Sequence, residues 1–157
     1  MRILSSSGQE AFDKPPHFDH RERKQLFVLR MALEDRAATL RTQSNQIGFF
    51  VICGYFKATK RFHFPQEFQE RDIGTAARIL GLRRSEYSPN ACAKQTLSSS
   101  AIILDHYGFA LFDAKTETAL AAEIVTTARI HLKPRLMFDC CVDFLVQRRF
   151  QVPRSGS

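Results

Sequence analysis

The sequence predicts an all-α fold with several helices, two pairs of which form helix-turn-helix units. Apolar residues recur three and four positions apart in one segment after another, as they do on one face of a helix. Glycine and proline stand where such segments end or begin: Gly81 and Gly108 follow two of them, and Pro134 opens a third. No Asn-Gly turn, which is typical of a β-hairpin, separates two apolar runs.

The predicted helices follow one another with short connections. Residues 1–17 are weakly patterned and end in a Pro-Pro pair, which predicts an N-terminal arm. The helices share apolar residues at helical spacing, and we expect them at residues 20–31, 33–40, 44–58, 67–80, 96–106, 114–130 and 134–149. Ser44 and Asp113 are the expected N-caps of two of them. Residues 82–93 are expected to be irregular because a Pro-Asn pair interrupts them.

Length and charge limit the class of protein. The chain has 157 residues, about the length of one domain, and 44% of them are apolar, which is ordinary for a globular protein with a hydrophobic core. Lys and Arg together number 23 against 16 Asp and Glu, and both halves of the chain share the excess. A basic surplus of this size favours an anionic partner, nucleic acid first and a membrane surface second.

Several classes of function find no support in the sequence. No apolar run approaches the length of a membrane span and no signal peptide is visible, so we expect a cytoplasmic protein with reduced cysteines. The five histidines are scattered and no C-x-x-C pair occurs, so neither a metal nor another cofactor is expected. Cys53, Cys140 and Cys141 are expected on buried helix faces, whereas Cys92 is expected in a loop. No catalytic motif is present, so the protein is not expected to be an enzyme.

A pattern occurs twice in the chain. "FFVICGYFKATKRFHFP" from Phe49 and "MFDCCVDFLVQRRFQVP" from Met137 share six identical positions when they are aligned at an offset of 88. Each segment carries an apolar stripe, then a basic pair, an aromatic residue and a proline, and each is preceded by a tight turn and another predicted helix. A duplicated helix-turn-helix unit explains this pattern. Chance similarity between two amphipathic helices with basic C-terminal turns explains it as well.

This organisation divides the chain into four predicted segments. They are an N-terminal arm (1–17), a first helix-turn-helix unit (18–66), a connecting helix and loop (67–95) and a second helix-turn-helix unit (96–157).

Three stretches resemble a known family. They are "LRTQSNQIGFFVICGYFKATKRF" (40–62), "HYGFALFD" (106–113) and "PRLMFDCCVDFLVQRRFQVPRS" (134–155). Their order and motifs resemble the N-terminal region of the large Tn-three-type bacterial transposases, with Arg41, Asn45 and Gly48 among the matching residues. Thr42 and Gln46 depart from it, since the family usually has Gly and Arg there.

The resemblance implies a function in DNA transposition. In that family this region belongs to a much longer chain and recognises the terminal inverted repeats of the transposon through helix-turn-helix units. Catalysis belongs there to a distant C-terminal domain with an acidic metal-binding triad. The resemblance therefore implies an excised domain or a remnant gene, acting at the bacterial nucleoid. Its expected partners are double-stranded DNA and the remainder of a transposase chain.

The helix-turn-helix interpretation nominates residues for DNA contact. The first turns of the second helix of each unit would meet base edges; the candidates there are Gln43, Ser44, Asn45, Gln46, Lys133 and Arg135. Basic residues nearby suit phosphate contacts, and these candidates are Arg41, Lys57, Lys60, Arg61, Arg83, Arg84, Lys94, Arg148 and Arg149.

Alternatives stay open for these residues and for the whole chain. Ser44 and Asn45 can simply cap a helix, and each basic residue can be a solvated surface charge. Asp139 and Asp143 lie along the second unit's helix and would repel phosphate there, so that unit can be structural. The rival function is a helical module that packs against other parts of a transposase complex, for which an exposed apolar patch would be the sign.

Overall fold

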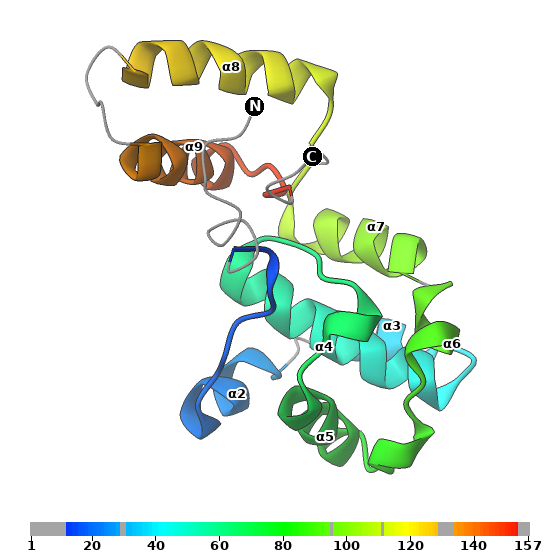
Figure 1. The fold of residues 1–157 in the computed structure, drawn as a ribbon. Helices are drawn as coiled ribbons and strands as arrows, with labels where there is room; N and C mark the ends of the chain where they lie inside the picture. The colour runs from blue at the N-terminus through cyan, green and yellow to red at the C-terminus, as the bar shows by residue number, and fades with distance from the viewer. Residues whose placement is uncertain (1–11, 29–30, 95, 111, 129–133, 154–157) are drawn as a thin grey trace. The chain divides into compact units, whose positions relative to one another are not determined.

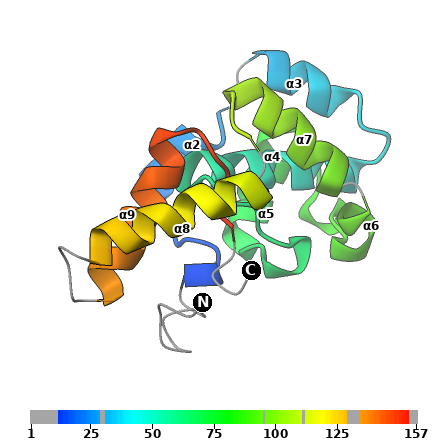
Figure 2. The same cartoon turned by 90° about the horizontal axis from the view of Figure 1, so that it is seen from above.

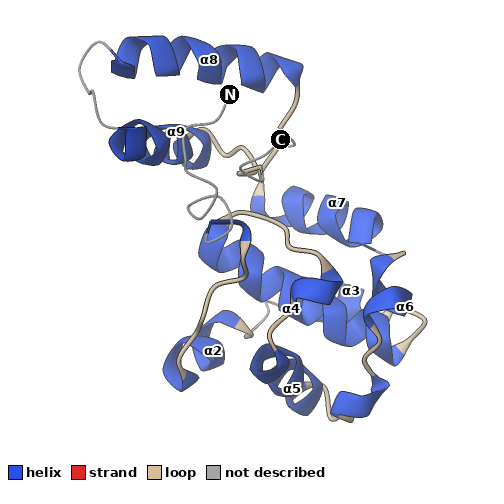
Figure 3. Cartoon of the chain, in the orientation of Figure 1, coloured by secondary structure: helices blue, strands red, loops and turns tan. Residues whose placement is uncertain are grey.

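The described part of the chain is built from α-helices. A computed structural model describes residues 12–28, 31–94, 96–110, 112–128 and 134–153. Its α-helices are α2 (His20–Leu26), α3 (Met31–Ala38), α4 (Gln43–Thr59), α5 (Glu70–Ile79), α6 (Pro89–Ala93), α7 (Thr96–Tyr107), α8 (Ala114–Ala128) and α9 (Pro134–Gln147). Two 3-10 turns, η1 (Pro65–Glu67) and η2 (Arg84–Glu86), complete the described elements, and Figure 3 shows no strand among them. The all-α prediction is confirmed.

The predicted helix ends are confirmed at several capping residues. Gly81 and Gly108 have positive φ angles of 71° and 69°, a conformation that glycine adopts without strain, and each ends a helix. Pro134 is the first residue of α9, where its missing N–H costs nothing. The Asp113 carboxylate accepts a hydrogen bond from the Thr116 backbone N–H at 2.9 Å and so caps α8.

Three predictions about helix bounds and caps are wrong. The helix expected at 20–31 ends at Leu26, because the chain turns at Phe27 and buries that ring completely. Ser44 is not the N-cap of α4: Thr42 takes that place, and its hydroxyl accepts from the Asn45 N–H at 3.1 Å. Residues 82–93 are not irregular throughout, since Pro89 is the first residue of α6.

The chain divides into two compact units. We call Pro15–His106 the middle unit, and the described residues of Met1–Lys14 and Tyr107–Ser157 form the terminal unit. The sequence-based boundaries at 66/67 and 95/96 both lie inside the middle unit. The four-segment organisation stays a prediction.

The middle unit is built around α4. Every residue from Ile47 to Phe56 is buried, so this helix has no solvent-facing side over that length. Helices α2, α3, α5 and α6 pack around it, as Figures 1 and 2 show from two directions. The sequence predicted a single apolar stripe along this segment; instead the helix is enclosed on all sides, and only its two ends are accessible.

Two glycines let neighbouring elements approach α4 closely. A Cβ atom at Gly48 would overlap the sulfur of Cys92 in α6, and one at Gly54 would overlap the ring of Phe27 after α2. Cys92 lies in α6, not in the expected loop, and is buried against α4. Burial raises the pKa of its thiol to about 11. Cys53 is buried as expected.

The terminal unit contains α8 and α9, which pack against each other. After α9 the chain pairs with the segment before α8, since the Ala110 N–H donates to Arg149 O at 2.8 Å and the Gln151 N–H donates to Ala110 O at 2.9 Å. Cys141 and Leu145 are buried, and Cys140 is half-buried. Both members of the repeated pattern are helical and end at equivalent residues, Thr59 and Gln147, but α4 is enclosed whereas α9 keeps exposed positions. Whether either pair is a helix-turn-helix unit stays a prediction.

Candidate nucleic-acid interface

The N-terminal end of α4 is accessible to solvent, and several predicted DNA-contact residues lie there. Arg41 and Gln43 are exposed there, on either side of the capping residue Thr42. The first turn of α4 contains no acidic residue. The positive end of the helix dipole is therefore not neutralised by a neighbouring carboxylate, which favours an anion at this position.

Ser44 joins α6 to this end of α4. Its buried hydroxyl donates to Ser88 O at 3.0 Å and accepts from the Ser88 N–H at 2.8 Å. The hydroxyl thus uses its one donor and one of its two acceptor lone pairs inside the protein. Ser44 therefore positions the start of α6, and its base contact stays a prediction.

The segment that contains α6 carries further basic residues. Arg83 and Lys94 are exposed, and they flank the segment that Ser88 fixes on α4. The Arg84 guanidinium lies 5.7 Å from the centre of the Tyr87 ring, and that ring lies beside Gly48 of α4. We call this group the α4–α6 corner; its members are Arg41, Gln43, Arg83, Arg84 and Lys94.

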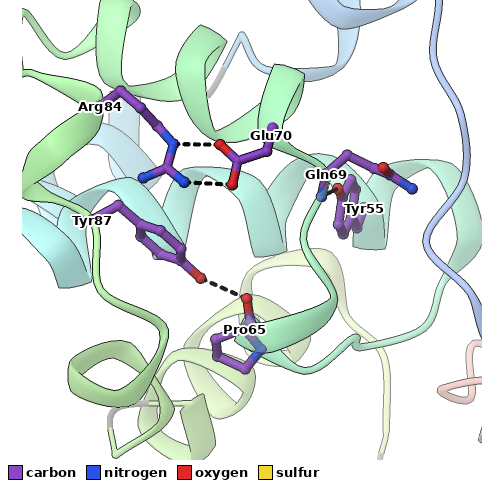
Figure 4. A network of polar contacts seen from close by, with 6 residues as sticks. All are labelled: Tyr55, Pro65, Gln69, Glu70, Arg84 and Tyr87. Atoms are coloured by element: carbon purple, nitrogen blue, oxygen red, sulfur yellow. Dashed lines mark hydrogen bonds and ion pairs between the residues drawn. The ribbon is translucent and has the colours of Figure 1, made fainter.

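Arg84 already has a carboxylate partner. Its Nε donates to Glu70 Oε2 at 2.7 Å and its Nη2 donates to Oε1 at 2.5 Å, as Figure 4 shows. The pair is solvent-accessible, with 42% of the Arg84 side chain and 75% of the Glu70 side chain exposed. The hydrogen bond lowers the pKa of Glu70 and raises the pKa of Arg84. The ring beneath Arg84 is itself fixed, because the Tyr87 hydroxyl donates to Pro65 O at 2.8 Å (Figure 4).

Two predicted base-contact residues lie one turn into α4 and are partly enclosed. Gln46 is half-buried, and its Nε2 donates to Leu40 O at 3.1 Å, so its amide holds the α3–α4 connection. Asn45 is also half-buried, and its Oδ1 is a buried atom without a hydrogen-bond partner. Of the four candidates in this helix, Gln43 is the exposed one.

Lys57, Lys60 and Arg61 lie at the opposite end of α4, about 25 Å from its start for a helix of 17 residues. The Lys57 amine donates to Val28 O at 3.2 Å, and the Lys60 amine donates to Lys57 O at 2.6 Å. These amines hold the C-terminal end of α4 and the segment that follows α2 through backbone carbonyls. Burial lowers the pKa of Lys60. Arg61 is half-buried beside them.

The terminal unit carries the other candidates. Arg148 and Arg149 are exposed after α9; the Arg148 guanidinium lies 4.5 Å from the centre of the Phe144 ring, and Arg149 Nη1 donates to Tyr107 O at 3.2 Å. Arg135 lies in the first turn of α9, but its side chain is outside the described part, and Lys133 is outside the described residues altogether.

The sequence interpretation missed the residues that organise the corner. Ser88 followed by Pro89 is a sequence signal for the start of a helix, because proline is favoured at the first helical position. The Pro-Asn pair was expected to interrupt this segment; instead Pro89 opens α6. No sequence pattern indicates that Glu70, 14 residues before Arg84, would become its partner.

Other kinds of site find no support in the described residues. They contain no group of three or more His, Cys, Asp or Glu side chains that could hold a metal ion. Within the same part of the chain, no helix has the length and apolar character needed to cross a membrane.

Comparison with known proteins places the chain in a family. Residues 3–156 match the family described as "Domain of unknown function (DUF4158)". The chain belongs to the DUF4158 family. The DUF4158 match includes both units, so the corner and the α8–α9 pair lie within one family domain. No curated protein and no solved structure matches this DUF4158 chain.

Proposed function

We propose that this chain binds double-stranded DNA, and that the α4–α6 corner of the middle unit supplies the phosphate contacts. The observation that carries the proposal is exposed Arg41 beside a helix N-terminus that has no acidic residue in its first turn. Ser88, which is hydrogen-bonded to Ser44 of that turn, lies in a segment that exposed Arg83 and Lys94 flank in the sequence. Basic side chains and a helix N-terminus both attract phosphate. The net charge of +7 adds a long-range attraction to DNA.

The resemblance to Tn-three-type transposases supports a more specific role. We propose that the DNA is the terminal inverted repeat of a transposon, and that this chain acts as the DNA-recognising part of a transposase whose catalytic domain lies elsewhere. Gln43 is the residue that we assign to base reading, because its exposed amide can pair with adenine in the major groove. We propose that Lys57 and Lys60 hold the C-terminal end of α4 rather than contact phosphate, since backbone carbonyls accept hydrogen bonds from their amines.

Fluorescence anisotropy tests this proposal. The chain is titrated onto a labelled duplex that carries the terminal inverted repeat of the element encoding it, and onto a scrambled duplex, between about 50 and 200 mM salt. We expect tighter binding to the repeat, with an affinity that falls steeply with salt. Gln43→Ala is expected to reduce the difference between the two duplexes with little change in the salt slope. Equal, weak binding to both duplexes would contradict end recognition.

One observation favours the rival function, a protein–protein interaction module. Helices α3 and α7 of the middle unit line an open cleft of about 330 Å³. Its lining includes the apolar side chains of Leu33 and Ile102, and Met31 at the start of α3 is 77% exposed. Sedimentation analysis of the chain and of Met31→Glu distinguishes the two functions. Self-association that the substitution abolishes, together with weak and non-selective DNA binding, would favour the interaction module over DNA binding.

A further inference from the structure

The Glu70–Arg84 pair has the geometry of phosphate recognition, with a carboxylate in the position of the phosphate. Arg84 presents Nε and Nη2 side by side, and the two oxygens of Glu70 accept one hydrogen bond each. A guanidinium binds two oxygens of a phosphate through the same planar fork. The side of Arg84 that would serve DNA is thus occupied by an acidic side chain of the protein itself.

The Arg84 guanidinium is held in position, whereas its partner Glu70 is exposed and can be displaced. Tyr87 lies under the guanidinium and is fixed through its hydroxyl to Pro65 O. Glu70 is the first residue of α5 and 75% of its side chain is exposed, so nothing encloses it against Arg84. Exposed ion pairs typically change an equilibrium by about fivefold or less. A polyanion that brings several phosphates to the corner can therefore displace it.

We propose that Glu70 is an internal competitor for DNA: it occupies Arg84 in the free protein, and a backbone phosphate replaces it in the complex. This inference rests on the proposed DNA binding at the α4–α6 corner. Its consequence is that Arg84 contacts phosphate only where the duplex also engages the other basic residues of the corner, since a single phosphate gains little over the carboxylate already present. The pair thereby weakens binding to isolated anions and to poorly fitting DNA.

A double-mutant cycle on the full chain tests the inference, with anisotropy of a labelled duplex as the readout. Glu70→Gln removes the competing charge and is expected to tighten binding about two- to fivefold. Glu117→Gln makes the same charge change at an exposed position of α8. An equal gain from it would show that net charge alone carries the effect, and would overturn the competitor role. In an Arg84→Ala background, Glu70→Gln is expected to have no effect on binding, because no guanidinium is left that the loss of the Glu70 charge could free for phosphate. Circular dichroism of each variant checks that it is folded.

The outcomes separate this inference from the proposed function. Binding by the parent chain with no gain from Glu70→Gln would overturn the competitor role and leave DNA binding intact. A gain that persists in the Arg84→Ala background would overturn it as well, because Glu70 would then act by general repulsion of DNA. Absence of binding by every variant would overturn the proposed function, and the competitor role with it.

Discussion

The Tyr55 hydroxyl shows how single residues hold the middle unit together. It donates to Asp72 Oδ2 at 2.6 Å and accepts from the Gln69 N–H at 3.0 Å, while the ring and the carboxylate are both buried. These bonds fix the start of α5 on the C-terminal half of α4, and the contact to Gln69 is visible in Figure 4. Burial, and then the hydrogen bond to Asp72, raise the pKa of Tyr55 above its ordinary value, so the hydroxyl stays protonated as a donor.

Tyr55→Phe is expected to lower the free energy of unfolding by about 1.5–3 kcal/mol, since it removes the hydrogen bond to a buried charged group. Urea denaturation measures the loss. The same substitution in an Asp72→Asn background is expected to cost less, because the acceptor is then neutral. An equal cost in both backgrounds would show that the ring environment, and not this hydrogen bond, carries the effect.

Asp72 predicts a pH dependence of stability. Burial is the main cause that raises the pKa of its carboxyl above 3.8, opposed by the hydrogen bond from Tyr55 and by the charges of Arg23 and His17. The folded state therefore binds this proton more tightly than the unfolded state does, and the contribution of Asp72 to stability falls as pH rises from 3.8 through the folded pKa. The difference in unfolding free energy between the parent chain and Asp72→Asn is expected to shift in favour of the variant over that range. Urea titrations across this range measure it; a constant difference would contradict the shift.

At the scale of elements, close packing against α4 determines the architecture. Phe27 can pack on α4 because Gly54 presents no side chain to it. Gly54→Ala is expected to destabilise the fold by about 1–3 kcal/mol, because the buried ring cannot move aside.

Gly74→Ala in α5 is the matched control: nothing lies within 4 Å of its Cβ position. There the gain in helix propensity, about 0.5–1 kcal/mol, is expected to stabilise the protein. Thermal unfolding of both variants measures the contrast, and a stabilising Gly54→Ala would contradict the packing.

Ser44 makes a second prediction at this scale, concerning the α4–α6 connection. Ser44→Ala removes both hydrogen bonds to Ser88 and leaves a backbone N–H without its partner. We expect a loss of about 1–3 kcal/mol in unfolding free energy. Hydrogen exchange should also show faster exchange of the α6 amides, whereas those of α5 stay protected. Unchanged protection of α6 would mean that Cys92 packing alone holds it.

Element predictions from the sequence succeeded where capping chemistry is local. Gly81, Gly108, Asp113 and Pro134 mark helix ends in the structure as they do in the sequence. The enclosure of α4 could not be predicted, because its surroundings come from segments up to 44 residues away, as the Ser44–Ser88 bond illustrates. The same limit applies to the candidate interface: charges and polar residues can be found in a sequence, but their pairing, as between Glu70 and Arg84, depends on tertiary contacts.

At the scale of the whole molecule, the two compact units predict separable folding. The middle unit has its own buried core, in which Phe49, Tyr55 and Ile103 are at most 1% exposed. A fragment of residues 15–106 is therefore expected to be helical and to unfold cooperatively on its own. Circular dichroism melting tests this; a broad transition without a cooperative step would show that the terminal unit is required for folding.

The measurement that tests the account most directly is the salt dependence of DNA binding by Arg41→Ala and Arg21→Ala. Both residues are exposed arginines of the middle unit. Arg41 belongs to the α4–α6 corner, whereas Arg21 lies in α2, which Lys57 holds at the other end of α4. Arg41→Ala is expected to weaken binding and to reduce the salt slope by about 0.9, the value of one lost phosphate contact, and Arg21→Ala to change neither. Equal effects of the two substitutions, or an unchanged slope for Arg41→Ala, would contradict DNA binding at the corner.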